Sequence, residues 1–435
     1  MAKISTEPYK GVRDFYPEDM FVQNYIFNTW KDVVESFGYV EYGASILEPA
    51  ELYRAKSGEE IVNNETYTFI DRGEREVTLR PEMTPTVARL VAARRQSLTY
   101  PLRWYSIPNL FRYEKPQRGR VREHWQLNVD IFGAASTEAD IEVIRIAHAI
   151  MKKFGAADTD FVIKLNSRTI TNDLYDAFNL NPDTRHTVSK LIDKKEKISA
   201  EDFSKLLHET IGDDASRFIE LLGSTDTLTA FLTEKMKKSS VTDLLAIMDT
   251  LKARGVENVV FDPTLMRGFD YYTGTIFEVF DLHPDNRRSV FGGGRYDELL
   301  EIFDAPKVPT FGFGAGDVTA RDFLEVHGLL PEYIPLTDIY LAVFSPEFMP
   351  HAQALADILR ADGVNVALDL SGKKVGDQIK IADKNSIPYI IVIGENEATS
   401  GLYTLKQLST GTEKKLSAHE IAEEITGGPT DIAAE

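Results

Sequence analysis

The feature that most constrains the fold of this chain is a run of alternating apolar and polar residues at 123–132. The apolar positions are Trp125, Leu127, Val129 and Ile131, and the polar positions are Gln126, Asn128 and Asp130. A period of two places each set on its own face of a β-strand. Because a half-buried strand rarely lines up three polar groups without a use for them, we expect one face to pack on a core and the other to form a site.

Cationic side chains gather immediately before this strand, in a loop at 112–122 that also contains a proline and a glycine. They are Arg112, Lys115, Arg118, Arg120 and Arg122. So many hydrogen-bond donors suit a polyphosphate or an RNA backbone. The alternative is a charged hairpin tip in solvent, but the polar row on the adjacent strand favours a binding site.

The surrounding patterns predict an α+β fold. Apolar residues recur at helical spacing over 17–37, and Gly38 follows where a helix would end. Further strands are expected at 76–79, 102–113, 121–132 and 271–280, and helices at 85–93 and 138–154. We expect an antiparallel sheet flanked by helices. Short helices rich in Lys, Asp, Glu and Leu predict a helical insertion at about 166–258.

A segment with two prolines at 331–335 is expected to be a linker. It divides the chain into a first domain at 1–330 and a second at 336–435. In the second domain apolar strand patterns alternate with helical ones, which is typical of a small α/β domain with partly parallel strands.

The composition excludes several classes of function. The 435 residues include no cysteine, so disulfides, thiolate-bound zinc, iron–sulfur clusters and thiol catalysis are ruled out. The eight histidines show no metal-binding spacing, and we expect no tightly bound metal. A net charge of −19 argues against nonspecific coating of nucleic acid. Without a long apolar run or an apolar N-terminal segment, we expect a cytoplasmic protein with no membrane partner.

Residues 78–85 (TLRPEMTP) predict a strand that turns into a helix. As a functional group, the carboxylate of Glu82 would accept an ammonium ion. In a purely structural interpretation, Thr84 caps a helix that begins at Pro85, and Glu82 is solvated. Taken alone, the segment favours the structural interpretation.

Two later segments allow a binding or a structural role. Arg267 lies on a turn before a strand that carries Tyr271 and Tyr272, and it either binds an anion or pairs with Asp270. The three glycines at 292–294 allow a close approach of the backbone to a ligand or to a neighbouring strand.

In their order and spacing, these segments resemble the histidyl-tRNA synthetases, a class II aminoacyl-tRNA synthetase family. The resemblance extends over essentially the whole chain. It rests on GVRDFYP at 11–17, TLRPEMT at 78–84, FRYEKPQRGRVREHWQ at 111–126, RGFDYYTG at 267–274 and GGGRYD at 292–297. The α/β segment at 336–435 resembles an anticodon-binding domain, which makes residues 1–330 the catalytic domain.

The resemblance implies a histidine–tRNA ligase. Such an enzyme activates L-histidine with ATP and Mg²⁺ to histidyl-adenylate and pyrophosphate, then transfers histidine to the 3′ end of tRNA(His). The implied partners are L-histidine, ATP, tRNA(His) and a second copy of the chain in a homodimer.

The resemblance also implies residue roles. Histidine-binding residues would be Glu82, Met83, Thr84, Gln126, Asp130, Tyr271, Tyr272, Gly292 and Gly293. ATP would contact Arg112, Glu114, Arg120, Arg122 and Arg267, with Arg112 and Arg267 catalytic. The tRNA would contact Lys115, Arg118, Lys373 and Lys374, although the last two lysines equally suit a solvated helix face.

The sequence departs from the family pattern at four positions. Thr319 replaces the motif 3 arginine that stacks on adenine, and Ser45 replaces the motif 1 proline of the dimer interface. Met83 replaces a glycine, and Asp130 stands where bacterial relatives often carry glutamate. These departures leave an alternative, a catalytically silent histidine sensor such as the regulatory subunit of ATP phosphoribosyltransferase. The anticodon-binding segment and Arg267 argue against it.

Overall fold

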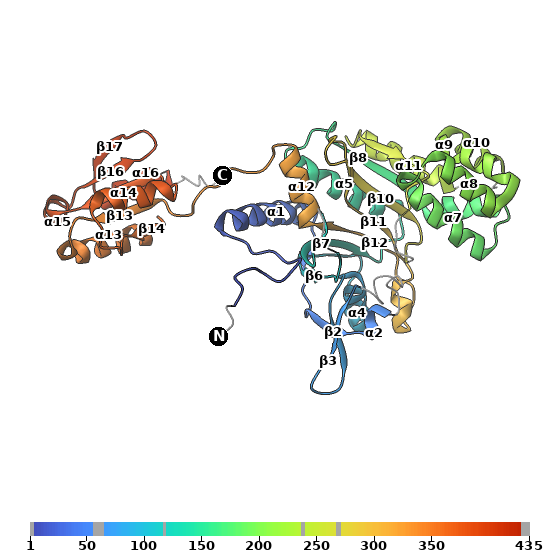
Figure 1. Cartoon of the computed structure of the whole chain (residues 1–435), viewed down its shortest axis with the longest axis horizontal. Helices are drawn as coiled ribbons and strands as arrows, with labels where there is room; N and C mark the ends of the chain where they lie inside the picture. The colour runs from blue at the N-terminus through green and yellow to red at the C-terminus, as the bar shows by residue number, and fades with distance from the viewer. Residues whose placement is uncertain (1–3, 55–64, 116–118, 236–239, 267–270, 428–435) are drawn as a thin grey trace. The chain divides into compact units, whose positions relative to one another are not determined.

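The computed structural model describes residues 4–54, 65–115, 119–235, 240–266 and 271–427. The chain forms two compact units, Met1–Pro331 and Glu332–Glu435, each with its own core (Figure 1). Among the described residues, no helix has the length and apolar character that a membrane crossing requires.

The first unit is built on a nine-stranded sheet that is antiparallel except at the pairs β1–β5 and β8–β9. In order across the sheet, the strands are β1 (Val40–Glu41), β5 (Leu102–Ser106), β7 (Glu123–Phe132), β12 (Thr310–Gly316), β11 (Ser289–Arg295), β10 (Thr275–Asp281), β8 (Phe161–Ser167) and β9 (Val259–Phe261), while β6 (Asn109–Phe111) pairs with β7. The predicted α+β class is confirmed.

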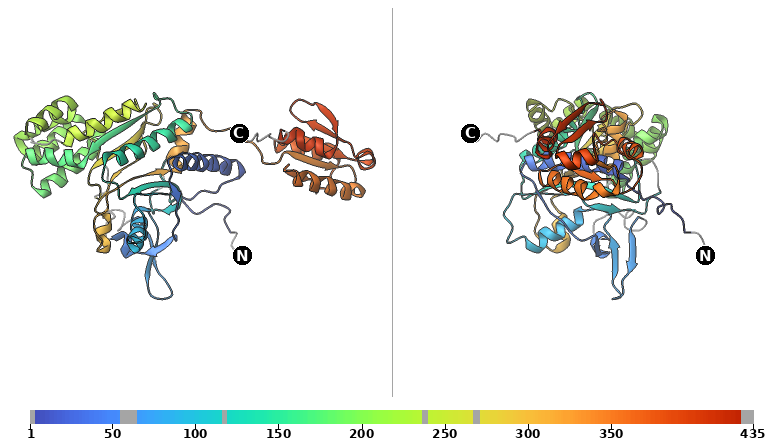
Figure 2. Two further views of the ribbon diagram at one scale, coloured as in Figure 1. Left: turned by 180° about the vertical axis from the view of Figure 1, so that it is seen from behind. Right: turned by 90° about the vertical axis from the view of Figure 1, so that its left-hand side faces the viewer.

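Three helices cover one face of this sheet, which we call the back face (Figures 1 and 2). They are α1 (Pro17–Ser36), α5 (Thr137–Lys153) and α12 (Asp317–Val326). Proline at its first position starts α1, and Gly38, at a φ of 81°, follows its end. Leu127 and Val129 are fully buried under these helices, so the predicted alternation along β7 is confirmed.

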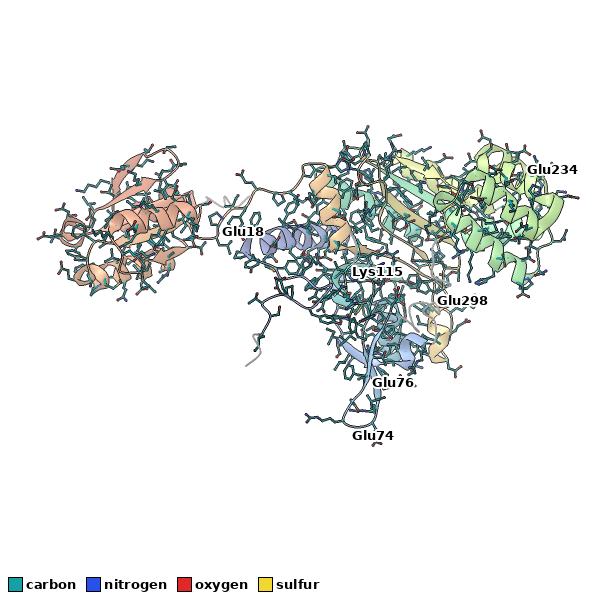
Figure 3. The ribbon with its side chains drawn as sticks, viewed as in Figure 1. Glu18, Glu74, Glu76, Lys115, Glu234 and Glu298 are labelled. Atoms are coloured by element: carbon teal, nitrogen blue, oxygen red, sulfur yellow. The ribbon has the colours of Figure 1, made fainter. Side chains whose placement is uncertain are left out.

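A small sheet lies beside the central one and carries the turn that enters the site. Its strands are β2 (Leu47–Pro49), β4 (Glu76–Leu79) and β3 (Tyr67–Ile70), accompanied by the helices α2 (Glu51–Arg54), α4 (Thr84–Arg94) and η3 (Leu299–Phe303). The β3–β4 hairpin projects from the unit in both Figures 1 and 2. Glu74, at its tip, has a φ of 60° and points outward in Figure 3.

A group of helices follows β8 and returns to the sheet at β9. They are α6 (Arg168–Ala177), α7 (Pro182–Lys194), η1 (Lys195–Lys197), α8 (Ala200–Ile211), η2 (Gly212–Asp214), α9 (Ala215–Gly223), α10 (Thr225–Lys235) and α11 (Ser240–Ala253). Because Ile163 of β8 pairs with Val259 of β9, the helices leave and rejoin the sheet at neighbouring strands.

The second unit has a five-stranded sheet in which β14 (Val366–Leu368), β13 (Ile339–Val343) and β15 (Tyr389–Ile393) run parallel. The strands β16 (Tyr403–Gln407) and β17 (Glu413–Leu416) continue it in antiparallel fashion. Its helices are η4 (Pro346–Phe348), α13 (Met349–Ala361), α14 (Val375–Lys384), α15 (Glu395–Ser400) and α16 (Ala418–Thr426). The partly parallel pairing is as predicted.

Replacing Trp30 by alanine should destabilise the first unit by about 3–5 kcal/mol, because the fully buried indole of α1 would leave a cavity in the core. Urea unfolding followed by the fluorescence of the two remaining tryptophans, Trp104 and Trp125, measures the loss. Tyr16→Ala is the control, since Tyr16 is 71% exposed, and its free energy of unfolding should change little. Equal losses in the two variants would contradict this packing.

Candidate active site

A cavity of about 140 Å³ lies over the glycine-rich middle of the central sheet, on the face opposite the back face. It is smaller than the ~300–1,000 Å³ of sites for drug-sized ligands. Its lining residues are Glu82, Thr84, Arg112, Gln126, Asn128, Asp130, Tyr271, Tyr272, Gly292, Tyr296, Gly312, Phe313 and Gly314. Segments far apart in the sequence therefore converge on one small polar chamber.

The polar row of β7 forms one side of the chamber. Gln126, Asn128 and Asp130 all line it, as the alternation predicted. Across the strand pair, Asp130 lies opposite Gly312, and Asn128 lies opposite Gly314. Side chains on one strand thus face bare backbone on the next.

The glycines of β11 and β12 make this close approach possible. A Cβ at Gly312 would lie 2.6 Å from the carbonyl oxygen of Val129 and would overlap Asp130. One at Gly314 would lie 2.8 Å from the amide of Gln126. Gly292 lines the chamber, whereas a Cβ at Gly293 would collide with the neighbouring strand at Phe313, 2.5 Å away. Gly293 therefore allows the close approach of a neighbouring strand, and the approach of the Gly292 backbone to a ligand stays a prediction.

Asp130 is deeply placed in the chamber, with 5% of its surface exposed. It accepts a hydrogen bond from the hydroxyl of Tyr296. Burial raises the pKa of Asp130 from its ordinary 3.8 to about 7, and the Tyr296 hydrogen bond opposes this shift. Tyr271 and Tyr272 complete an aromatic cluster with Tyr296, at ring-centroid distances of 5.7 and 6.5 Å.

The turn between β4 and α4 brings Glu82 to the chamber. The guanidinium of Arg80 fixes this turn by donating to the carbonyl oxygens of Asn109, at 3.0 Å, and Ala44, at 2.9 Å. Glu82 is only 3% exposed, so the alternative of a solvated Glu82 is wrong.

The prediction that Thr84 caps a helix beginning at Pro85 is also wrong. Helix α4 begins at Thr84 itself, and Met83 occupies the cap position without a side-chain hydrogen bond. The cause is local conformation, because Met83 already has helical backbone angles. Thr84 lines the chamber, while Met83 is buried, with 1% of its surface exposed, and does not line it.

The cationic loop contributes Arg112 to the chamber, where its Nε donates to the Pro81 carbonyl oxygen at 2.9 Å. Glu114 lies 3.4 Å from the exposed Arg120. This contact is an ion pair between Nη1 of Arg120 and Oε2 of Glu114. Arg122 does not line the chamber, and its guanidinium stacks on the ring of Tyr113 at 4.0 Å.

Five predicted site residues remain, and the structure describes three of them. Arg118 and Arg267 fall outside the described residues. Lys115 is exposed on the first unit (Figure 3), and Lys373 and Lys374 are exposed on the second.

Several lining residues received no role from the sequence. They are Asn128, Tyr296, Gly312, Phe313 and Gly314. Asn128 belongs to the alternating row and Tyr296 to the GGGRYD segment, so both carried a usable signal. Gly312 and Gly314 belong to a glycine-rich stretch of the sequence, but the sequence alone does not show which strand pairs with it.

No cluster of three metal-ligating side chains occurs among the residues that the structure describes. Thr319 donates its hydroxyl proton to the Val290 carbonyl oxygen at 2.6 Å. The Ser45 hydroxyl accepts from the Leu47 backbone at 3.2 Å.

A mainly antiparallel sheet with helices on one face and a polar, arginine-bearing chamber on the other defines a class II aminoacyl-tRNA synthetase. The profile of the family described as histidyl-tRNA synthetase matches residues 11–317, and that of an anticodon binding domain matches residues 338–427. The chain belongs to the histidyl-tRNA synthetase family.

Relatives named histidine–tRNA ligase match this chain over nearly its full length. A histidine–tRNA ligase of Leptospira biflexa is 41% identical over 97% of this chain and 98% of its own, and one of Haloarcula marismortui is 36% identical over 93% and 94%. The solved histidyl-tRNA synthetase of Nostoc superposes with a TM-score of 0.84 at 25% identity, covering 98% of this chain and all of its own. A structure from Bacillus halodurans, described as an ATP phosphoribosyltransferase regulatory subunit/histidyl-tRNA synthetase, superposes at 0.74 with 26% identity, over 90% of this chain and all of its own.

The raised pKa of Asp130 predicts a pH-dependent stability. Between about pH 4 and pH 7 the folded chain holds a proton on Asp130 that the unfolded chain has lost, so stability should fall as the pH rises through this window. The contribution is about 1 kcal/mol per pH unit. Urea unfolding of the wild type and of Asp130→Asn over this range should give curves that diverge with pH. Parallel curves would contradict the shift.

Proposed function

We propose that the chamber activates L-histidine with ATP and that the chain then transfers histidine to tRNA(His). The observation that carries the proposal is the convergence of Glu82, Gln126, Asp130 and Tyr272 with Arg112 in one small cavity. Membership of the family and relatives named histidine–tRNA ligase over the full length support ligation of histidine to tRNA as the function. No observation favours the sensor alternative.

The ends of the amino acid match the ends of the chamber. The α-ammonium group would lie between the carboxylate of Glu82 and the side-chain oxygens of Thr84 and Gln126. Such a site is charge-complementary, and its low exposure strengthens the attraction.

The imidazole would lie between Asp130 and Tyr272, against Tyr271 and the backbone of Gly292 and Gly293. A neutral imidazole offers one N–H donor and one lone pair, which match a carboxylate acceptor and a phenol donor. An amino acid without these groups would leave part of the hydrogen-bonding capacity of Asp130 unsatisfied, which discriminates more strongly than the shape of an apolar pocket. Met83 would support this wall from within the core.

ATP would lie along the cationic side. Arg112 and Arg267 would hold the α-phosphate, and Glu114, Arg120 and Arg122 would hold the remaining phosphates and the base. The carboxylate of histidine attacks an anionic phosphorus in line with departing pyrophosphate, so the two arginines offset the repulsion and stabilise the developing charge. Mg²⁺ bound with ATP would neutralise phosphate charge.

The tRNA would contact both units. Lys115 and Arg118 would meet its acceptor end, and Lys373 and Lys374 would meet the anticodon stem. We propose that residues 336–435 form the anticodon-binding domain after a linker at 331–335, that residues 1–330 form the catalytic domain with the helices at about 166–258 inserted, and that two chains form a homodimer.

Histidine-dependent exchange of labelled pyrophosphate into ATP tests the function. The wild type should catalyse the exchange, and Arg112→Ala should lower kcat by about 10²- to 10³-fold, because a cation at the α-phosphate is removed. Calorimetry of histidine binding runs in parallel. Histidine binding by a wild-type protein that supports no exchange would overturn the ligase in favour of the sensor.

Asp130→Ala should raise the KM for histidine about 10- to 100-fold while the KM for ATP stays nearly constant, since the buried hydrogen-bonding partner of the imidazole is removed. The same exchange assay at saturating ATP measures it. Asp262→Ala is the matched control, because this aspartate of the same unit pairs with Lys164 and does not line the chamber. An unchanged KM for histidine in Asp130→Ala would refute the imidazole assignment.

Replacing Lys373 and Lys374 together by glutamate should weaken tRNA binding and reduce the slope of log affinity against log salt by about 2, because each lysine would no longer neutralise a phosphate. Filter binding over a salt series measures the slope. Histidine-dependent exchange should be unchanged, because it uses the other unit. An unaltered slope would favour the solvated helix face.

A further inference from the structure

We propose that Tyr9, in the segment before α1, is a positioning residue for the cationic loop at 112–122 and acts through Arg122. The proposal rests on the function proposed above, in which this loop holds ATP. Tyr9 itself does not line the chamber. The residues from Tyr9 to Phe15, which we call the N-terminal strap, connect the base of the loop to the back face of the central sheet.

The base of the cationic loop continues the pairing of β6 with β7. Phe111 lies opposite Glu123 in the register of these strands. One position further, the backbone N–H of Arg112 donates to the carbonyl oxygen of Arg122 at 2.9 Å. Because Arg112 lines the chamber, an interaction that fixes Arg122 also fixes the backbone that carries a proposed ATP ligand.

The side chain of Arg122 closes the base of the loop. Only 9% of this residue is exposed, although it belongs to a loop rich in cations. Its Nε donates to the carbonyl oxygen of Glu114 at 3.2 Å, across the loop. Its guanidinium stands over the ring of Tyr113 at 4.0 Å. The last residue of the loop is thereby tied to the residues that follow Arg112.

Tyr9 brings the N-terminal strap to this guanidinium. Its hydroxyl accepts a hydrogen bond from Nη1 of Arg122 at 3.1 Å, and its ring centroid lies 5.5 Å from the central guanidinium carbon. The backbone adds a contact, since the N–H of Arg122 donates to the carbonyl oxygen of Gly11 at 2.7 Å. Gly11 has a φ of 90°, which favours glycine. Cation–π attraction and hydrogen bonds therefore act together on one arginine.

The other end of the N-terminal strap is fastened separately. Arg13 donates to Asp317 at 2.8 Å, and the side chain of Asp317 is fully buried. The same carboxylate accepts from the backbone N–H of Trp125 at 2.9 Å. The ring of Phe15 packs edge-on against Trp125 at a centroid distance of 5.5 Å. Since this end is bound to β7 and α12, Tyr9 has a firm support from which to hold Arg122.

A loop that is already held in one conformation binds its ligand at a lower entropic cost than a loop that the ligand must order. In the proposed function, Arg112, Glu114 and Arg120 of this loop contact ATP. The proposed histidine site is formed instead by β7, the glycine strands and the turn before α4. Loss of Tyr9 should therefore weaken the binding of ATP and leave the binding of histidine nearly unchanged.

Histidine-dependent pyrophosphate exchange measures both effects. Tyr9→Ala should raise the KM for ATP about tenfold, while the KM for histidine changes less than about twofold. Tyr9→Phe keeps the ring and loses the hydroxyl acceptor, so its KM for ATP should lie between those of the wild type and Tyr9→Ala. Tyr16→Ala is the matched control, because Tyr16 is 71% exposed, and both KM values should stay constant. An unchanged KM for ATP in Tyr9→Ala, or an equal rise in both KM values, overturns the proposal.

A double-mutant cycle tests whether Tyr9 acts through Arg122. Arg122→Met, which also removes a proposed ATP contact, should raise the KM for ATP. Adding Tyr9→Ala to this variant should raise it no further, because the guanidinium that Tyr9 holds is gone. Two independent increases that multiply in the double variant would overturn the positioning role.

Limited proteolysis examines the loop without any assumption about the function. Trypsin should cleave after Arg120, whose side chain is 62% exposed, about tenfold faster in Tyr9→Ala than in the wild type. Cleavage after Arg254 of the same unit, with a side chain 44% exposed, should keep its rate and is the reference for global unfolding. If the wild type shows no exchange, the proposed function fails, yet faster cleavage after Arg120 alone still supports Tyr9 as the residue that positions the loop. Equal cleavage rates in the two proteins, or a parallel rise at both sites, overturn it.

Discussion

The site depends on the absence of side chains on two adjacent strands. Gly312 and Gly314 of β12 lie opposite Asp130 and Asn128, so polar side chains of β7 lean over bare backbone. Glycine weakens a strand by roughly 0.5–1 kcal/mol per residue. The back face of the same sheet offsets this cost, because β7 buries Leu127 there in the largest core of the chain. The back face of the sheet therefore stabilises the fold by burying apolar side chains, and the opposite face leaves room for the chamber.

The selectivity proposed for the chamber depends on how deeply its polar groups are placed. Asp130 is 5% exposed, and Tyr296 satisfies only part of its hydrogen-bonding capacity. Leaving a buried acceptor unpaired costs roughly 1–3 kcal/mol. An amino acid that carries both a donor and an acceptor on a flat ring avoids this cost, whereas one with an aliphatic side chain does not. Burial thus raises the pKa of Asp130, and in the proposed function the same desolvation would sharpen the choice of amino acid.

Much of the fold and the core of the site were predictable from local patterns. The alternation along β7 and the helical spacing of α1 each depend on neighbours in the sequence, and both predictions are confirmed. Contacts between distant residues were not predictable. Tyr296 meets Asp130 across 166 positions, and Arg13 meets Asp317 across 304, so no window of sequence reveals them. The prediction that Thr84 caps the helix was wrong for a local reason. Met83 already has helical backbone angles, so helix α4 begins at Thr84 itself.

Two regions of the first unit are fastened by different parts of the chain. The proposed amino-acid site is formed by β7 and the glycine strands of the central sheet and by the turn before α4, which follows β4 of the small sheet. At the end of β12, Asp317 accepts hydrogen bonds from the N-terminal segment, α1 and β7. A change at this junction alters the support of Arg13 without moving the glycine floor under Asp130. The proposed histidine site is therefore anchored separately from this junction.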